Sequence, residues 1–218
     1  MDEQPKPVDA PTIRSFSQYG EDAVMLHFLY LNPRIRNGFY VDVGAYDPVQ
    51  YSNTWHLYKR GWRGINIDVV ADRIEKFKAA RPEDKNVLAA VGDTEGELEV
   101  FEHPQWATMT TVDTVTAANT QSRPVGKLVS RRLENILAEY GVDHIDYMNI
   151  DVEGFEMKVL SSFDPKKYGV SLFTVELLTQ NINDILNSDL YRYMTDRGYV
   201  FCAWTGWTLF FRSPSLAL

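Results

Sequence analysis

The stretch FYVDVGAYDP, residues Phe39–Pro48, decides the fold class of this chain when it is set beside GINIDV, Gly64–Val69. In the first stretch an apolar run ends at Asp42 and Gly44 follows, and the second apolar run ends at Asp68. Buried parallel strands have this continuous apolar character, and ligands of open α/β sheets bind outside the carboxyl ends of such strands. The two stretches therefore predict neighbouring strands that deliver two acids and a glycine to one nucleotide-type site.

The glycine pattern after the first strand distinguishes between nucleotide cofactors. A dinucleotide pyrophosphate needs close backbone approach at several points, which a GxGxxG sequence provides. Here Tyr46 and Asp47 stand where further glycines are needed, and a second acid beside the loop repels phosphate. The site therefore suits a cofactor with a ribose and no phosphate, for which S-adenosylmethionine is the best candidate. The missing glycines argue against an NAD-dependent oxidoreductase.

Composition narrows the classes of partner. The 218 residues include 44% apolar residues, enough for a sizeable core, and the formal charge is −8, which argues against a nucleic-acid substrate. The one cysteine, Cys202, excludes an internal disulfide and fits a small buried hydrophobe. No apolar run approaches the ~20 residues that a membrane span needs, and residues 1–12 are polar and proline-rich, unlike a signal peptide. We expect a cytoplasmic protein with a flexible N-terminal arm over residues 1–13.

Alternating strand and helix patterns follow along most of the chain. The expected strands cover residues 38–43, 64–69, 86–91, 98–101, 126–130, 145–150, 170–177, 199–204 and 207–212, and the expected helices cover residues 17–31, 52–60, 71–80, 132–140, 154–161 and 182–197. Repeated βα units followed by a hairpin predict one mostly parallel sheet with helices on both faces and an antiparallel pair at its end. Residues 102–125 lack clear periodicity, so we expect a long loop with at most a helical turn, which serves as a substrate loop or lid or is disordered.

Six segments occur in a fixed order: SQYGED (17–22), GFYVDVGAYDPVQYSNT (38–54), RGWRGINIDV (60–69), RPEDKNVLAAVGD (81–93), IDYMNIDVEGFEMKVL (145–160) and KYGVSLFTVELL (167–178). The ordered set, above all YSNT and IDVEG, resembles the FkbM-type S-adenosylmethionine-dependent methyltransferase family. The resemblance implies a class I methyltransferase (Rossmann-like) fold with a seven-stranded sheet, in one domain over residues 14–214. It also implies O-methylation of a hydroxyl on a sugar, a glycan or a small natural product. An N-methyltransferase acting on a small amine and a non-catalytic S-adenosylmethionine-binding module remain open alternatives.

The strand ends supply the first group of predicted cofactor-binding residues. Asp42 and Gly44 let the methionine part of the cofactor approach the backbone, with an acid that only caps a tight turn as the structural alternative. Asp68, followed by Val69, lies 24 residues beyond Gly44, close to the ~20 expected for an acid that binds ribose hydroxyls. The alternative for Asp68 is a helix N-cap, and both roles can hold together.

A second group flanks the predicted pocket. After the third strand, Val91 is expected to pack on the adenine ring, and Gly92 and Asp93 match the family position beside the adenine, where the alternative is an ordinary turn. Ser52 and Asn53 open the first crossover helix, whose N–H groups can receive the methionine carboxylate, unless Ser52 is only an N-cap. The family also places the segment before the first helix over the pocket, with Gln18 and Tyr19 as binding residues, although Tyr19 also suits the core.

The predicted catalytic residues are three acids. Asp151 closes the fourth strand beside the expected sulfonium, Glu153 follows it, and Glu176 ends the fifth strand. Methyl transfer to a hydroxyl requires alignment and removal of a proton, and a carboxylate alone is a weak base for a sugar hydroxyl. Two remedies are open: a histidine, His56 or His103, or a divalent metal such as Mg²⁺ bound by Asp151, Glu153 and Glu176. The alternative for these acids is capping of helices or binding of the cofactor's ammonium group.

Overall fold

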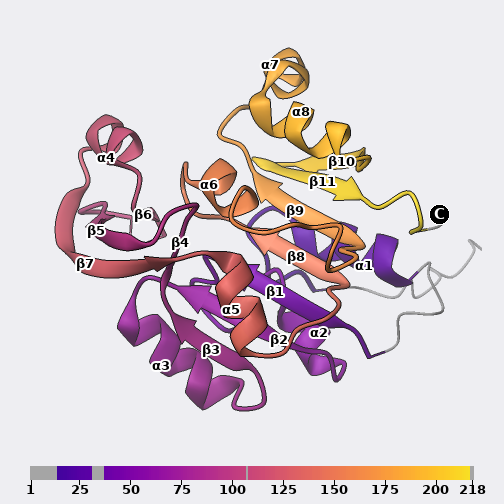
Figure 1. The fold of residues 1–218 in the computed structure, drawn as a ribbon, viewed down its shortest axis with the longest axis horizontal. Coiled ribbons are helices and arrows are strands. Elements are labelled where there is room, and N and C mark those ends of the chain that lie inside the picture. The colour runs from indigo at the N-terminus through magenta and orange to yellow at the C-terminus, as the bar shows by residue number, and fades with distance from the viewer. Residues whose placement is uncertain (1–13, 31–36, 107, 217–218) are drawn as a thin grey trace, which may run out of the picture.

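The computed structural model of the chain describes residues 14–30, 37–106 and 108–216, so the expected arm over residues 1–13 lies outside it. The main feature is a seven-stranded sheet (Figure 1), in the order β10 (Val200–Thr205), β11 (Thr208–Arg212), β9 (Leu172–Glu176), β8 (Tyr147–Ile150), β1 (Phe39–Val43), β2 (Arg63–Asp68) and β3 (Lys85–Leu88). Strand β11 is antiparallel to both of its neighbours, and the other neighbouring pairs are parallel. The predicted seven-stranded sheet with a terminal antiparallel hairpin is confirmed.

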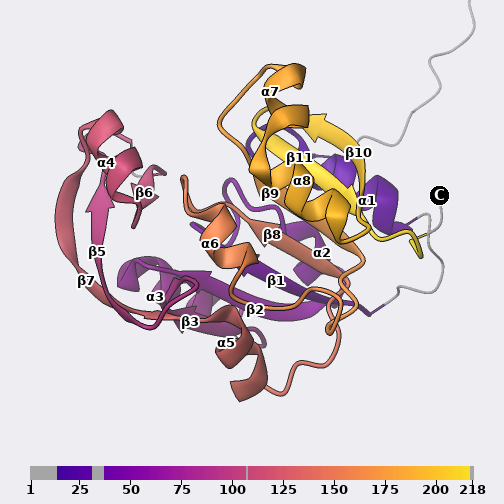
Figure 2. The same cartoon turned by 45° about the horizontal axis from the view of Figure 1, so that its top comes forward.

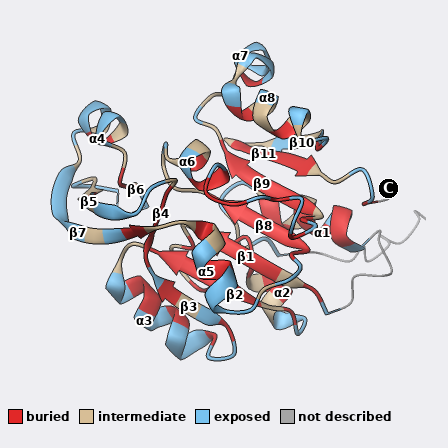
Figure 3. Cartoon of the chain, in the orientation of Figure 1, coloured by how far each residue is buried: buried red, intermediate tan, exposed pale blue. Residues whose placement is uncertain are grey.

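Both faces of this sheet are covered by helices, and the central strands are buried along nearly their whole length (Figure 3). Successive side chains of a strand point to opposite faces, so Tyr40 and Val41 enter different cores. Tyr40 packs in the core that also contains residues of α1 (Glu21–Tyr30) and α2 (Trp55–Lys59). Val41 packs in the larger core, with residues of α5 (Leu133–Glu139), α6 (Glu156–Leu160), α7 (Ile182–Asn187) and α8 (Asp189–Asp196). Helix α3 (Ala71–Ala80) packs along β2 and β3, within the predicted bounds.

A second sheet of four strands was not predicted. It has the order β4 (Ala90–Val91), β7 (Arg123–Arg131), β5 (Gly96–Glu102) and β6 (Thr110–Thr111), and α4 (Thr114–Thr120) precedes β7. The prediction of a long loop over 102–125 was therefore wrong, and the expected strand 86–91 is divided between the two sheets. Figures 1 and 2 show β5 and β7 curving away from the main sheet, which explains why this region lacks the apolar pattern of a covered strand.

Three predicted helices begin three or more residues later than expected or are divided in two, each for a local reason. The first begins at Glu21 rather than at residue 17, because the Asp22 carboxylate accepts the Phe16 N–H and holds the preceding residues outside the helix. The second begins at Trp55, whose N–H donates to the Ser52 hydroxyl. The last predicted helix is two helices, since Ser188 is extended (ψ 152°) and caps α8. The expected end at residue 31 lies outside the described residues. None of the helices in the described part of the chain is long and apolar enough to cross a membrane.

Candidate active site

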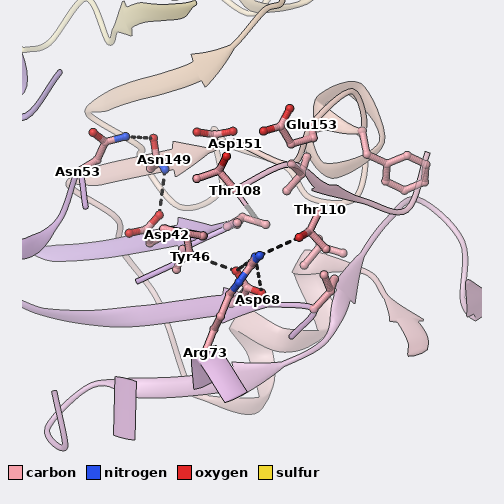
Figure 4. Close-up of a pocket in the computed structure, with 18 of the residues that line it drawn as sticks. Asp42, Tyr46, Asn53, Asp68, Arg73, Thr108, Thr110, Asn149, Asp151 and Glu153 are labelled. Carbon is pink, nitrogen blue, oxygen red and sulfur yellow. Dashed lines mark hydrogen bonds and ion pairs between the residues drawn. The ribbon is translucent and has the colours of Figure 1, made fainter. Parts of the chain in front are cut away.

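A pocket opens at the carboxyl ends of β1, β2 and β8, where the sequence delivers Asp42, Asp68 and Asp151 (Figure 4). It contains about 860 Å³ of empty space, counting the part that is open to solvent. The second sheet closes one side, since Val91 of β4 and Thr110 of β6 belong to the walls.

A row of polar side chains crosses the main sheet beside this pocket. Asn66, Asp42, Asn149 and Thr174 occupy directly paired positions on β2, β1, β8 and β9. Asn149 Nδ2 donates to Asp42 at 2.9 Å, while Asn149 Oδ1 accepts from Thr174 Oγ1 at 2.7 Å. The same oxygen accepts from Asn53 Nδ2 at 3.0 Å (Figure 4). Because an ionised carboxylate can only accept, Asp42 fixes the orientation of both amides in the pocket wall.

The Asp42 carboxylate itself is almost completely buried, at 1% exposure. Its second oxygen accepts from Thr54 Oγ1 at 2.7 Å, which ties it to the start of α2. Burial raises the pKa of Asp42 above its usual value, and the hydrogen bonds from Thr54 and Asn149 oppose that rise. Asp42 therefore both lines the pocket and holds the polar row together.

Gly44 allows two strand ends to meet at the floor of the pocket. Its backbone has φ +82°, and a Cβ atom there would lie 1.6 Å from the carbonyl oxygen of Asp151. No other residue fits at such a distance, so the glycine permits the close approach of β1 and the segment after β8. We expected Gly44 to allow close approach of a cofactor. In the structure, the close approach that it allows is to the backbone of Asp151.

The Asp68 carboxylate accepts hydrogen bonds from three neighbouring residues. Its carboxylate accepts the N–H groups of Tyr46 at 3.0 Å and Val70 at 2.8 Å, and Arg73 Nη1 lies 3.3 Å from each oxygen. The Arg73 guanidinium also packs over the Tyr46 ring, 4.8 Å from its centroid, and donates to Thr110 Oγ1 at 2.7 Å. Asp68 therefore faces the pocket as a carboxylate paired with a buried arginine (Figure 4).

The part of the pocket nearest the second sheet is apolar. Its walls include the side chains Val69, Val91, Val112 and Phe155, together with Ala89. Gly92 makes room for this wall, because a Cβ atom there would lie 3.2 Å from the Phe155 ring and 2.9 Å from Ser130 Oγ. A flat apolar ring fits here, whereas a phosphate would find no donor among these side chains.

Three carboxylates converge at the other end. Oxygens of Asp151, Glu153 and Glu176 all lie within 4.8 Å of one another, and Figure 4 shows Asp151 and Glu153 side by side. Burial and then the neighbouring acids raise the pKa of Asp151 and of Glu176 well above their usual values. Burial, followed by the charge of Glu156, raises the pKa of Glu153 to about 7. The Asp151 and Glu176 carboxyl groups lie close together, and because burial and the neighbouring negative charges raise both pKa values, the cluster favours keeping a proton over full ionisation.

The loop after β8 is built to present Glu153. Its backbone has φ +54°, a left-handed conformation that is unusual for glutamate. Glu156 Oε1 accepts the N–H groups of Val152 and Gly154, each at 3.1 Å, and Thr111 Oγ1 donates to the Glu153 carbonyl at 2.8 Å. Hydrogen bonds on both sides therefore hold the strained residue, and one of them comes from the second sheet.

Comparison with known proteins agrees with this geometry. The family model of the methyltransferase FkbM domain matches residues 42–201, which span the strand ends and acids described above. The chain belongs to the FkbM methyltransferase domain family.

Other comparisons add less. No curated protein matches the sequence. Among solved structures, a precorrin-6y C5,15-methyltransferase from Geobacter metallireducens GS-15 is 11% identical, with a TM-score of 0.41 over 87% of this chain and 85% of that one. A likeness at this level carries no argument about function.

Most predicted cofactor residues of this FkbM-family chain line the pocket: Gln18, Asp42, Gly44, Asn53, Asp68, Val69, Val91 and Asp151. Four others lie behind its walls or beside it. Ser52 accepts from Trp55 N and Arg81, and Gly92 supports Phe155. Asp93 pairs with Lys158 at 2.9 Å, while Tyr19 packs edge-on against Trp207. Of the predicted catalytic acids, Asp151 and Glu153 line the pocket, and Glu176 lies behind them.

Neither candidate histidine lines the pocket. His56 of α2 has its Nε2 atom 2.7 Å from the Arg14 carbonyl oxygen and 3.6 Å from Asp22 Oδ2. His103 stacks on Trp106 with ring centroids 4.5 Å apart. In the described part of the chain, the proton-accepting groups at the pocket are therefore carboxylates.

The pocket residues that sequence reasoning missed include Tyr46, Arg73, Thr110, Asn149 and Phe155. Asn149 gave a usable signal, because it is the polar residue inside the apolar strand YMNI. No local sequence signal identified Arg73 and Thr110, since their positions beside Asp68 depend on how the second sheet packs on the first.

Proposed function

We propose that this chain is an S-adenosylmethionine-dependent methyltransferase with a class I fold that methylates a hydroxyl oxygen of a sugar, a glycan or a small natural product. One observation carries the cofactor class. Among the described residues, four acidic side chains line the pocket and its one arginine is already paired with Asp68. Such a site favours a ligand that carries positive charge and disfavours a pyrophosphate.

Successive parts of the pocket wall suit the adenine, the ribose and the amino-acid part of this cofactor. The apolar wall around Val91 and Phe155 suits the adenine ring, and Asp68 is placed for the ribose hydroxyls. Asp68 already accepts from two N–H groups and from Arg73, so a ribose would share or replace the arginine. The polar wall with Asp42 and Asn53 suits the amino-acid part, which leaves the reacting centre near Asp151.

When bound, S-adenosylmethionine supplies a methyl group that is already activated by its sulfonium. The protein then has to align the acceptor hydroxyl and remove its proton. Glu153 suits the second task, because its pKa of about 7 leaves much of it ionised at neutral pH and makes it a stronger base than an ordinary glutamate. The raised pKa values of Asp151 and Glu176 favour the protonated form of these acids, which limits the negative charge at the site.

The same three acids suit a divalent cation as the alternative aid to deprotonation. Mg²⁺ prefers oxygen ligands, and the three carboxylates are close enough to bind one ion together. A bound cation would favour their ionised forms and would supply a Lewis acid beside the acceptor hydroxyl.

Calorimetry with S-adenosylmethionine, S-adenosylhomocysteine and NAD tests the cofactor class. We expect binding of the first two and none of NAD; heat with NAD alone would refute the proposal. Incubation with methyl-labelled cofactor and separate panels of hydroxyl and amine acceptors then distinguishes O-methylation from N-methylation. Cofactor binding without transfer to any acceptor would favour a non-catalytic binding module.

A further inference from the structure

We propose that Arg81, which lies outside the pocket, is a positioning residue for the cofactor's amino-acid part. It holds the segment Pro48–Thr54 and, through Thr54, the Asp42 carboxylate. The inference rests on the proposed function, because it assigns the polar wall of the pocket to that part of the cofactor.

Arg81 forms hydrogen bonds with three residues of the segment Pro48–Thr54. Its side chain is fully buried, at 0% exposure. Nε donates to the Pro48 carbonyl at 3.0 Å, and Nη2 donates to the same carbonyl and to Ser52 Oγ, the latter at 2.7 Å. Nη1 donates to Thr54 Oγ1 at 2.8 Å. A single guanidinium therefore fixes both ends of this segment.

The segment matters because it carries part of the pocket wall. Tyr51 and Asn53, which lie between the anchored residues, both line the pocket. Tyr51 has φ +56°, a backbone conformation that needs support from its surroundings. Loss of the anchors on either side would release both side chains.

The charge of Arg81 also acts on the pocket residue Asp42, with the Thr54 hydroxyl between them. Arg81 forms no ion pair with any carboxylate in the described residues, although it is buried. Instead, the Thr54 hydroxyl accepts from Arg81 and donates to Asp42 at 2.7 Å. The positive charge lowers the energy of the ionised Asp42 carboxylate, which in turn orients Asn149 and Asn53.

Lysine cannot replace this arginine. The guanidinium is a planar group with five donors, and here it donates to acceptors on four different residues, the fourth being Asn66 Oδ1 at 3.5 Å. An ammonium on a flexible stem lacks that fixed geometry. The rings of Phe77, Trp55 and Tyr58, with centroids 5.0 to 5.5 Å from Arg81 Cζ, enclose the guanidinium. Arg81→Lys thus keeps the positive charge and removes the set of hydrogen bonds to Pro48, Ser52 and Thr54, and Arg81→Met removes both the charge and the hydrogen bonds.

The test compares S-adenosylhomocysteine with adenosine, which lacks the amino-acid part. We expect each Arg81 variant to lose about tenfold or more in affinity for S-adenosylhomocysteine and to bind adenosine within about twofold of the wild type. Hydrogen exchange should rise selectively in residues 47–54. Leu190→Ala is the matched control, because Leu190 is buried in α8 within the core on the other face of the sheet and its truncation destabilises the fold without touching the segment.

The outcomes separate the two levels of the proposal. Wild-type protein that binds neither ligand would refute the proposed function. Wild-type binding with equal affinities in folded Arg81 variants, or an equal loss in Leu190→Ala, would overturn the role of Arg81. If the Arg81 variants do not fold, Thr54→Val decides, since it cuts the link to Asp42 and leaves Arg81 in place. Unchanged S-adenosylhomocysteine affinity in that variant would also overturn the inference.

Discussion

Arg73 and Asp68 form a buried ion pair in which the arginine Nη1 lies 3.3 Å from each carboxylate oxygen. The other terminal nitrogen of Arg73 donates to Thr110 Oγ1 at 2.7 Å, so the pair connects the end of β2 with β6 of the second sheet. This ion pair therefore connects the wall of the pocket to the acid that we propose binds the cofactor's ribose.

Replacing Arg73 with methionine should destabilise the fold strongly. The change leaves the buried Asp68 carboxylate without its cation, and breaking a buried pair from one side costs roughly 3–5 kcal/mol. The double variant Arg73→Met/Asp68→Asn should recover part of that loss, because the unpaired charge is gone. Urea denaturation of the single and double variants measures both values. A loss below about 1 kcal/mol in Arg73→Met would show that the pair is not effectively buried.

Asp68→Asn should weaken binding of S-adenosylhomocysteine by about tenfold to a hundredfold, since a ribose loses a charged acceptor worth ~1–3 kcal/mol. Asp72→Asn is the control, because Asp72 is an exposed acid in the first turn of α3 and changes the net charge equally. Calorimetry at a temperature where both variants are folded gives the two affinities. Equal affinities would remove Asp68 from the binding site.

Gly44→Ala should be among the most damaging substitutions in the chain. The added methyl group meets the Asp151 carbonyl at 1.6 Å and also occupies a backbone with φ +82°. Gly61→Ala shares the second problem, with φ +89°, but has nothing within 4 Å of the new Cβ. The control should therefore lose only the ~1–2 kcal/mol of left-handed strain, while Gly44→Ala loses clearly more or fails to fold. Similar thermal midpoints for the two variants would contradict the close approach.

Glu153 should make the folded state less stable as the pH rises. Its pKa is raised from 4.5 to about 7 on folding, so the folded state binds the proton more tightly than the unfolded state does. The free energy of unfolding therefore falls between about pH 4.5 and pH 7, by up to ~3 kcal/mol for this group. Glu153→Gln should flatten that slope when urea denaturation at pH 5 and pH 8 is compared in the presence of EDTA. Parallel slopes in the two proteins would contradict the assignment.

Mg²⁺ should raise the melting temperature of the wild type at pH 8 if the three acids bind it, because the ion replaces repulsion among carboxylates with attraction. Glu176→Gln should reduce that increase, and addition of EDTA should reverse it. Glu102→Gln, which changes an acid on β5 outside this cluster, is the control for general charge screening. An identical Mg²⁺ response in all three proteins would exclude this site as the place where the ion binds.

Local sequence patterns predicted much of the fold. The seven strands of the main sheet and helix α3 were expected within a few residues of their observed bounds, because apolar runs and helical periodicity are local signals. The second sheet was not expected, since β5 and β7 are largely exposed and carry charged residues where a covered strand would be apolar. The break at Ser188 was also missed, because it depends on one hydroxyl that caps α8.

The site shows the same division. Asp42, Asp68 and Asp151 could be placed from sequence, because each closes a buried strand and parallel strands end at one edge of a sheet. The row from Asn66 to Thr174 could not, since it requires the register of four strands. The hydrogen bond from Arg73 to Thr110 and the closeness of Asp151 to Glu176 could not be predicted either, because each involves segments far apart in the chain.

The amino-acid sequence alone determined which strands end in acids and therefore at which edge of the sheet the pocket lies, because burial and backbone geometry act over a few neighbouring residues. Only the tertiary structure decided how those acids are charged and held. Arg73, Arg81 and the neighbouring carboxylates reach them across the fold, and the strength of each interaction depends on distance and burial that no local pattern records.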